Sequence, residues 1–163
     1  MTRSNAELAN SFGNLAQRTL SLLHKNCDGH LPPIHGHTDE DEQLFAAVAR
    51  AVREEMPEAF ERLALSQACE SWMQAVFACN AYIDAQAPWA LRKTDPERMK
   101  TVLATLYIVI AQLAVAISPV IPESAAKLLD AMGVDPDLRD FEGTHSHWYS
   151  PLADSGYRLE KPV

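Results

Sequence analysis

One stretch of the sequence, VLATLYIVIAQLAVAI at 102–117, carries almost nothing but apolar side chains. Its sixteen residues include Thr105 and Gln112, and they fall short of the roughly 18 apolar residues that indicate a membrane-spanning helix. A helix that is apolar on every side has to be covered on every side. The stretch therefore predicts a helix buried in the middle of a bundle, not a membrane span.

Segments that could cover such a helix lie on both sides of it in the sequence. The segment 5–25 repeats apolar residues at the i, i+4, i+7 spacing of an amphipathic helix. Thr38 before four acids, and Asp95 before Pro96, are typical helix starts. We therefore predict helices at 5–25, 39–56 continuing over 57–64 past a kink at Pro57, 66–86, 96–117 and 122–132.

These segments predict a single domain, 1–163, of the all-α class. We expect a bundle of about five helices with an irregular C-terminal tail packed back on it. At most short extended pieces near 147–149 and 157–159 are expected in the tail. Because proline lacks a backbone donor, Pro88 is expected to end the helix 66–86 and to leave Trp89 on a loop.

The chain is acidic, with 14 Lys and Arg against 22 Asp and Glu and a formal net charge of −8. This balance argues against a protein that coats nucleic acid by bulk charge, and we expect no DNA partner. The acids at 39–42, Asp41 among them, occupy positions that look exposed, so helix capping and solubility explain them. The balance is mildly basic after Trp89, where four cations face two acids (Arg92, Lys93, Arg98 and Lys100 against Asp95 and Glu97).

The three cysteines form no C-x-x-C pair, and the first ten residues do not resemble a secretory signal. A reducing compartment is the simplest setting for such a chain. We therefore predict a cytoplasmic protein without a membrane partner.

Two features suit unpaired nucleic-acid bases. Asn10, Asn14 and Arg18 are spaced by four, which places their amide and guanidinium groups in one row on the predicted first helix. A solvated polar face would give the same pattern. Trp89 follows Pro88, which fixes the backbone, and its indole offers a flat surface for stacking. The alternative is that Trp89 folds inward and plugs the end of the bundle.

Histidines and one cysteine gather near the end of the first predicted helix (His24, Cys27, His30, His35 and His37). Their donor types suit zinc, but their spacing fits no common zinc motif, so a histidine-bearing surface loop is the favoured interpretation. His145 and His147 receive the same interpretation. No phosphate-binding glycine loop, G-x-S-x-G elbow or H-E-x-x-H motif is present. We predict no metal site and no catalytic residue in this chain.

Two strings resemble the C-terminal anticodon-binding helical domain of methionyl-tRNA synthetase, a class I aminoacyl-tRNA synthetase. They are NSFGNLAQR at 10–18 and NAYIDAQAPWALRK at 80–93, and the resemblance runs from about residue 5 to 163. It implies a domain that reads the CAU anticodon of methionine tRNAs, elongator and initiator. It also implies that Trp89 stacks on the first anticodon base, a cytosine, beside Asn10, Asn14, Arg18 and Pro88. Arg92 and Lys93 are candidate phosphate contacts.

The family's catalytic motifs do not occur here. The resemblance therefore implies that methionine activation takes place in an upstream catalytic domain of a longer parent chain, with ATP and Mg²⁺ there and no cofactor in this segment. Three alternatives stay open at this point: a helical protein–protein interaction module that docks Trp89 into a partner, a metal-dependent bundle enzyme using the loop histidines, and the anticodon domain of another class I synthetase.

Overall fold

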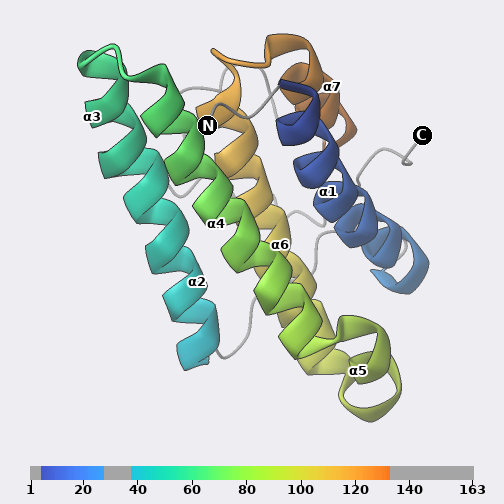
Figure 1. Ribbon diagram of the computed structural model, residues 1–163. Coiled ribbons are helices and arrows are strands. Elements are labelled where there is room, and N and C mark those ends of the chain that lie inside the picture. The colour runs from blue at the N-terminus through green and yellow to red at the C-terminus, as the bar shows by residue number, and fades with distance from the viewer. Residues whose placement is uncertain (1–4, 28–37, 133–163) are drawn as a thin grey trace.

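The computed structural model describes residues 5–27 and 38–132, and within these ranges the chain is built of helices joined by short turns (Figure 1). The predicted all-α class is confirmed. The elements in chain order are α1 (Asn5–Cys27), α2 (Asp39–Arg50), the π-helical turn η1 (Ala51–Glu55), α3 (Met56–Glu61), α4 (Leu65–Gln86), α5 (Pro88–Thr94), α6 (Pro96–Ile117) and α7 (Pro122–Met132). The expectations for His30, His35 and His37 and for the tail with His145 and His147 lie outside the described residues.

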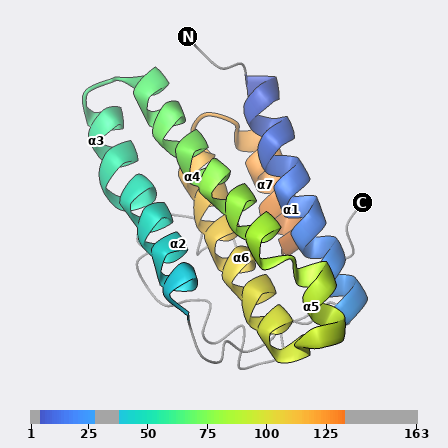
Figure 2. The same cartoon turned by 60° about the horizontal axis from the view of Figure 1, so that its bottom comes forward.

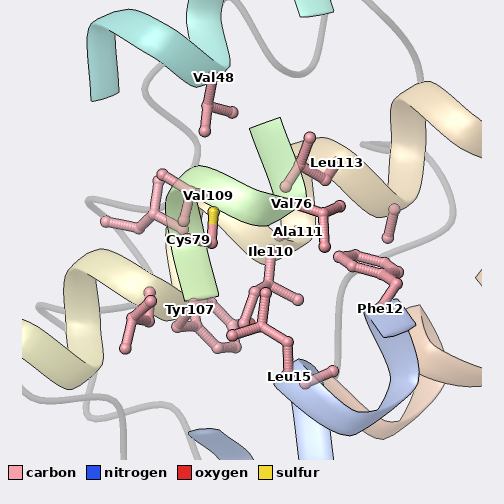
Figure 3. Close-up of a cluster of buried hydrophobic side chains, with 14 of the residues drawn as sticks. Phe12, Leu15, Val48, Val76, Cys79, Tyr107, Val109, Ile110, Ala111 and Leu113 are labelled. Atoms are coloured by element: carbon pink, nitrogen blue, oxygen red, sulfur yellow. The ribbon is translucent and has the colours of Figure 1, made fainter. Parts of the chain in front are cut away.

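The apolar stretch forms most of α6, which is the central helix of the bundle. Every residue from Thr101 to Ile117 is buried. By length and composition α6 could cross a membrane, yet 94% of its most apolar window is buried inside the protein. The helices α1, α2, α4 and α7 all contact it, and Figure 3 shows side chains of α1, α2 and α4 converging on Tyr107, Ile110 and Leu113. This confirms that the apolar stretch lies in the core of the bundle.

Two helix starts were recognisable from their caps, and both are confirmed. The hydroxyl of Thr38 accepts a hydrogen bond from the backbone N–H of Asp41, and the Asp41 side chain accepts one from the Thr38 N–H. At the start of α6, the Asp95 carboxylate accepts a hydrogen bond of 3.2 Å from the N–H of Arg98. These caps satisfy amide donors that have no partner inside the helix.

The helix around Pro57 continues through a π-helical turn. In η1 the N–H of Met56 donates to the carbonyl of Ala51, five residues back. Pro57 lacks a donor, and its ring would collide with the carbonyl four residues earlier in a regular α-helix. The wider turn over Ala51–Glu55 accommodates that ring, so the helical path runs on into α3.

The segment after Pro88 differs from the expected loop. Ala87 has a left-handed backbone, with φ of 47° and ψ of 62°, and ends α4. Pro88 then begins α5, so Trp89 lies on a short helix and the loop prediction was wrong. The reason is that proline is favoured at the first helical position, where no amide partner is needed. Seen from the end of the bundle, α5 connects α4 to α6 on the side where α1 also ends (Figure 2).

Candidate nucleic-acid interface

Trp89 is presented on the surface of the bundle. Trp89 is 44% exposed, and among the described residues it is one of the few large hydrophobic residues outside the core. Pro88, directly before it, is buried, and Leu91 packs against the core. The inner side of α5 is therefore anchored in the bundle, and the indole of Trp89 is not an internal plug.

Arg18 comes from α1 and lies against the Trp89 ring. Its guanidinium carbon is 5.5 Å from the ring centre, within the range of a cation–π contact. One nitrogen of the same group is 3.2 Å from an Asp84 oxygen on α4. The fold thus brings together Arg18 and Trp89, which the sequence had given as two separate candidates.

Asn10 and Asn14 lie on the same row of α1 as Arg18, and both are exposed. A helix rises about 1.5 Å per residue, so Asn14 is about 6 Å and Asn10 about 12 Å along the axis from Arg18. Neither amide has a hydrogen-bond partner among the described residues. Their exposed amides lie on the row of α1 that leads from Arg18 toward the start of the helix.

Arg92 and Lys93 are exposed in the last turn of α5. Within the described ranges neither makes an ion pair. Lys100 is in a different situation, because its ammonium group lies 3.4 Å from Glu97. Among the described residues, the unpaired positive charge beside Trp89 therefore comes from Arg92 and Lys93, whereas Arg18 is paired with Asp84.

Arg98 does not belong to this exposed basic group. Its side chain is only 16% exposed, and it forms a two-pronged ion pair with Asp41, with nitrogen–oxygen distances of 2.7 and 2.9 Å. A nitrogen of Arg98 also donates to Gln86, at 2.8 Å, and to Thr38, at 3.2 Å. The sequence-based count of cations near Trp89 therefore included Arg98 wrongly.

Asp41 is fully buried, so the expectation of an exposed acid was wrong. Its carboxylate accepts hydrogen bonds from the Tyr82 hydroxyl and from Arg98. Burial alone would raise the pKa of Asp41, but the hydrogen bonds from Arg98, Tyr82 and Thr38 outweigh it and hold that pKa below its ordinary value. Burial and the neighbouring Asp41 raise the pKa of Tyr82. The cluster ties α2, α4 and α6 together beside α5.

Sequence reasoning did not single out Asp84 and Gln86 as members of this region, and it counted Arg98 as a cation near Trp89 without its buried partner Asp41. The capping spacing of Thr38 and Asp41 was a visible signal for a helix start. Nothing in that spacing pointed to Arg98, because their contact depends on how α2 packs against α6.

In the described parts of the chain, no group of three or more His, Cys, Asp and Glu side chains is placed to hold a metal ion. His24 is on α1, while His30, His35 and His37 lie outside the described residues. The zinc hypothesis therefore gains no support from the residues that can be placed.

Comparison with known proteins gives consistent matches. The family described as the anticodon binding domain of methionyl tRNA ligase matches residues 31–155. Two methionine–tRNA ligases are each 45% identical to this chain: that of Rhizobium meliloti (strain 1021) over 86% of the chain, and that of Mesorhizobium japonicum over 91%. The chain covers 27% and 28% of these relatives, respectively.

Solved structures agree with the sequence matches. The apo form of Mycobacterium tuberculosis methionyl-tRNA synthetase aligns with a TM-score of 0.88 at 34% identity, covering 98% of this chain and 32% of that one. The same enzyme in complex with methionyl-adenylate gives a TM-score of 0.88, again at 34% identity. The chain thus spans about a third or less of the proteins it resembles.

Proposed function

This chain belongs to the family of anticodon-binding domains of methionyl-tRNA ligases, and we propose that it recognises the CAU anticodon of methionine tRNAs. The observation that carries this proposal is the half-exposed indole of Trp89 with the Arg18 guanidinium beside it. An aromatic surface next to a cation is what an unstacked base with its phosphate requires.

Each candidate side chain has a distinct role in this proposal. Trp89 stacks on the first anticodon base, and Arg18 limits where that base can lie on the ring. Asn10 and Asn14 read base edges, because an amide carries both a donor and an acceptor. Pro88 fixes the start of α5, and Arg92 and Lys93 attract the phosphate backbone, which compensates locally for the net charge of −8.

The parent protein is proposed to be a methionine–tRNA ligase that charges elongator and initiator tRNAs in the cytoplasm. Support comes from the names of the relatives and from the methionyl-adenylate complex of one of them, an intermediate whose formation consumes ATP. ATP and Mg²⁺ are assigned to the upstream catalytic domain, and tRNA selection to this chain. Cys69 and Cys79 are free thiols, which agrees with a reducing compartment.

Binding of short RNA hairpins tests the proposal. The 163-residue chain is titrated into a fluorescently labelled stem-loop carrying CAU, and into a matched stem-loop in which the first anticodon base is changed to G. We expect tighter binding of the CAU loop, and weaker binding of both at higher salt because the phosphate contacts are electrostatic. Equal affinity for the two loops would overturn anticodon reading. No RNA binding at any salt concentration would favour the alternative in which Trp89 docks into a protein partner.

A further inference from the structure

One side-chain hydrogen bond joins the two ends of the segment that carries Trp89. Gln86 is the last residue of α4, and Arg98 lies in the first turn of α6. The Gln86 side-chain oxygen accepts a hydrogen bond of 2.8 Å from Arg98. This contact joins the end of α4 to the start of α6, so it fixes the distance between the two ends of the segment that contains α5.

Arg98 is itself held in place. Both prongs of its guanidinium contact the buried carboxylate of Asp41, and a further hydrogen bond reaches Thr38. A planar guanidinium paired in this two-pronged way has a fixed orientation. The direction of the Arg98 nitrogen that donates to Gln86 is therefore fixed by Asp41. Asp41 belongs to α2, which lies outside the segment between α4 and α6.

The short helix α5 depends on such external support. It has seven residues, and helices of this length are not stable by themselves in water. Both flanking residues leave the helical conformation, with φ of 47° at Ala87 and −151° at Asp95. A change of the backbone at either residue would tilt α5 and alter the distance between Trp89 and Arg18.

We infer that Gln86 and Arg98 are positioning residues for anticodon recognition: their hydrogen bond, aimed by Asp41, holds α5 at the tilt that places Trp89 beside Arg18. The inference rests on the proposed function, because it assigns to these residues a share of RNA affinity. It also predicts that, in the protein without RNA, the surroundings of Trp89 change when the hydrogen bond is lost.

The test removes the Gln86 oxygen and leaves the buried ion pair intact. Gln86→Ala is compared with Gln74→Ala, a matched change on an exposed position of α4 whose side chain donates to Glu70 in the same helix. We expect Gln86→Ala to weaken CAU stem-loop binding about three- to tenfold, the range of one hydrogen bond to a charged group partly replaced by water. Gln74→Ala should have no effect. Gln86→Glu keeps an oxygen acceptor for Arg98 and should restore binding.

A double-mutant cycle distinguishes positioning from general destabilisation. If Gln86 acts through Trp89, Gln86→Ala should cost nothing further in a Trp89→Ala background, measured at low salt where residual binding persists. An equal loss in both backgrounds, or no loss in either, would overturn the inference.

A measurement without RNA separates this inference from the proposed function. The chain is labelled with 5-fluorotryptophan, and the ¹⁹F resonance of Trp89 is assigned by its disappearance in Trp89→Phe. Gln86→Ala should shift that resonance and leave that of buried Trp72 unchanged, and Gln86→Glu should return it. An unmoved Trp89 resonance would overturn the inference even if RNA binds as proposed. A shifted resonance together with RNA affinity that is unaffected by Trp89→Ala would instead overturn the proposed function.

Discussion

The guanidinium carbon of Arg18 lies 5.5 Å from the centre of the Trp89 ring, which joins the row of polar residues on α1 to the indole on α5. The Asp84 carboxylate lies 3.2 Å from the same guanidinium. Arg18 is therefore positioned by an acid on α4 and an aromatic ring on α5. The arrangement leaves the Trp89 ring about half exposed, so a base can reach it.

Arg18→Gln should weaken binding of the CAU stem-loop about tenfold, because it removes a positive charge beside the stacking surface. The same change should lower the free energy of unfolding by less than about 1 kcal/mol, since exposed ion pairs contribute little. Fluorescence anisotropy and urea denaturation measure the two quantities. A large loss of stability with unchanged binding would contradict the assigned role of Arg18.

Two tryptophans of this chain should differ strongly in how much the same substitution changes stability. Trp72 is buried, donates a hydrogen bond of 2.9 Å to the Leu113 carbonyl and contacts Phe12 edge to face. Trp72→Phe should therefore lower the free energy of unfolding by about 2 kcal/mol. Trp89→Phe should change it by less than about 0.5 kcal/mol. Urea denaturation followed by circular dichroism gives both values, and equal losses would contradict the burial of one ring and the exposure of the other.

Asp41→Asn should lower the free energy of unfolding at pH 7 by about 3 kcal/mol, because it leaves Arg98 without its buried counter-ion. The folded-state pKa of Asp41 lies below its ordinary value of 3.8, so the stabilisation is fully present above that value and is lost as the pH falls through the lower folded-state pKa. The difference between the native chain and Asp41→Asn should therefore shrink in acid.

The control for this pH dependence is Asp39→Asn, an exposed acid in the same turn of α2. It removes the same charge from the same helix end, and its cost should stay below about 1 kcal/mol. A pH-independent difference for Asp41→Asn, or equal costs for the two variants, would contradict the buried ion pair.

Cys79 should resist thiol reagents in the native chain. It is fully buried, and burial raises its pKa to about 12, so almost none of it is thiolate at pH 8. In a variant carrying Cys27→Ser and Cys69→Ser, Ellman's reagent should react with Cys79 only after urea is added. Rapid reaction without urea would show that α4 does not pack against the core as described.

The sequence was sufficient to predict the bundle because the apolar pattern of α6 admits few alternatives. A helix buried from Thr101 to Ile117 requires amphipathic partners, and the caps at Thr38 and Asp95 show where two helices begin. The two local differences involve prolines. Pro57 is preceded by a π-helical turn, and Pro88 begins a helix after the left-handed residue Ala87. A proline in a sequence marks an interruption without showing which backbone resolves it.

The candidate site was only partly predictable for a different reason. Trp89 and the row from Asn10 to Arg18 could be selected by residue type, but their proximity depends on how α1 packs beside α5. Asp41 looked like one more exposed acid because its partners, Tyr82 and Arg98, are distant in the sequence. Contacts of this kind appear only once the helices are placed relative to one another.

The most direct measurement of the central claim compares the native chain with Trp89→Ala in binding two stem-loops, one with CAU and one with G in place of the first anticodon base. Loss of the stacking surface should cost about 1–3 kcal/mol, which is roughly 5- to 150-fold in affinity for CAU. The ratio of the two affinities should fall toward one, because the first base is no longer held where its edge can be read. If Trp89→Ala keeps the native preference for CAU, Trp89 is not the surface on which the anticodon is read.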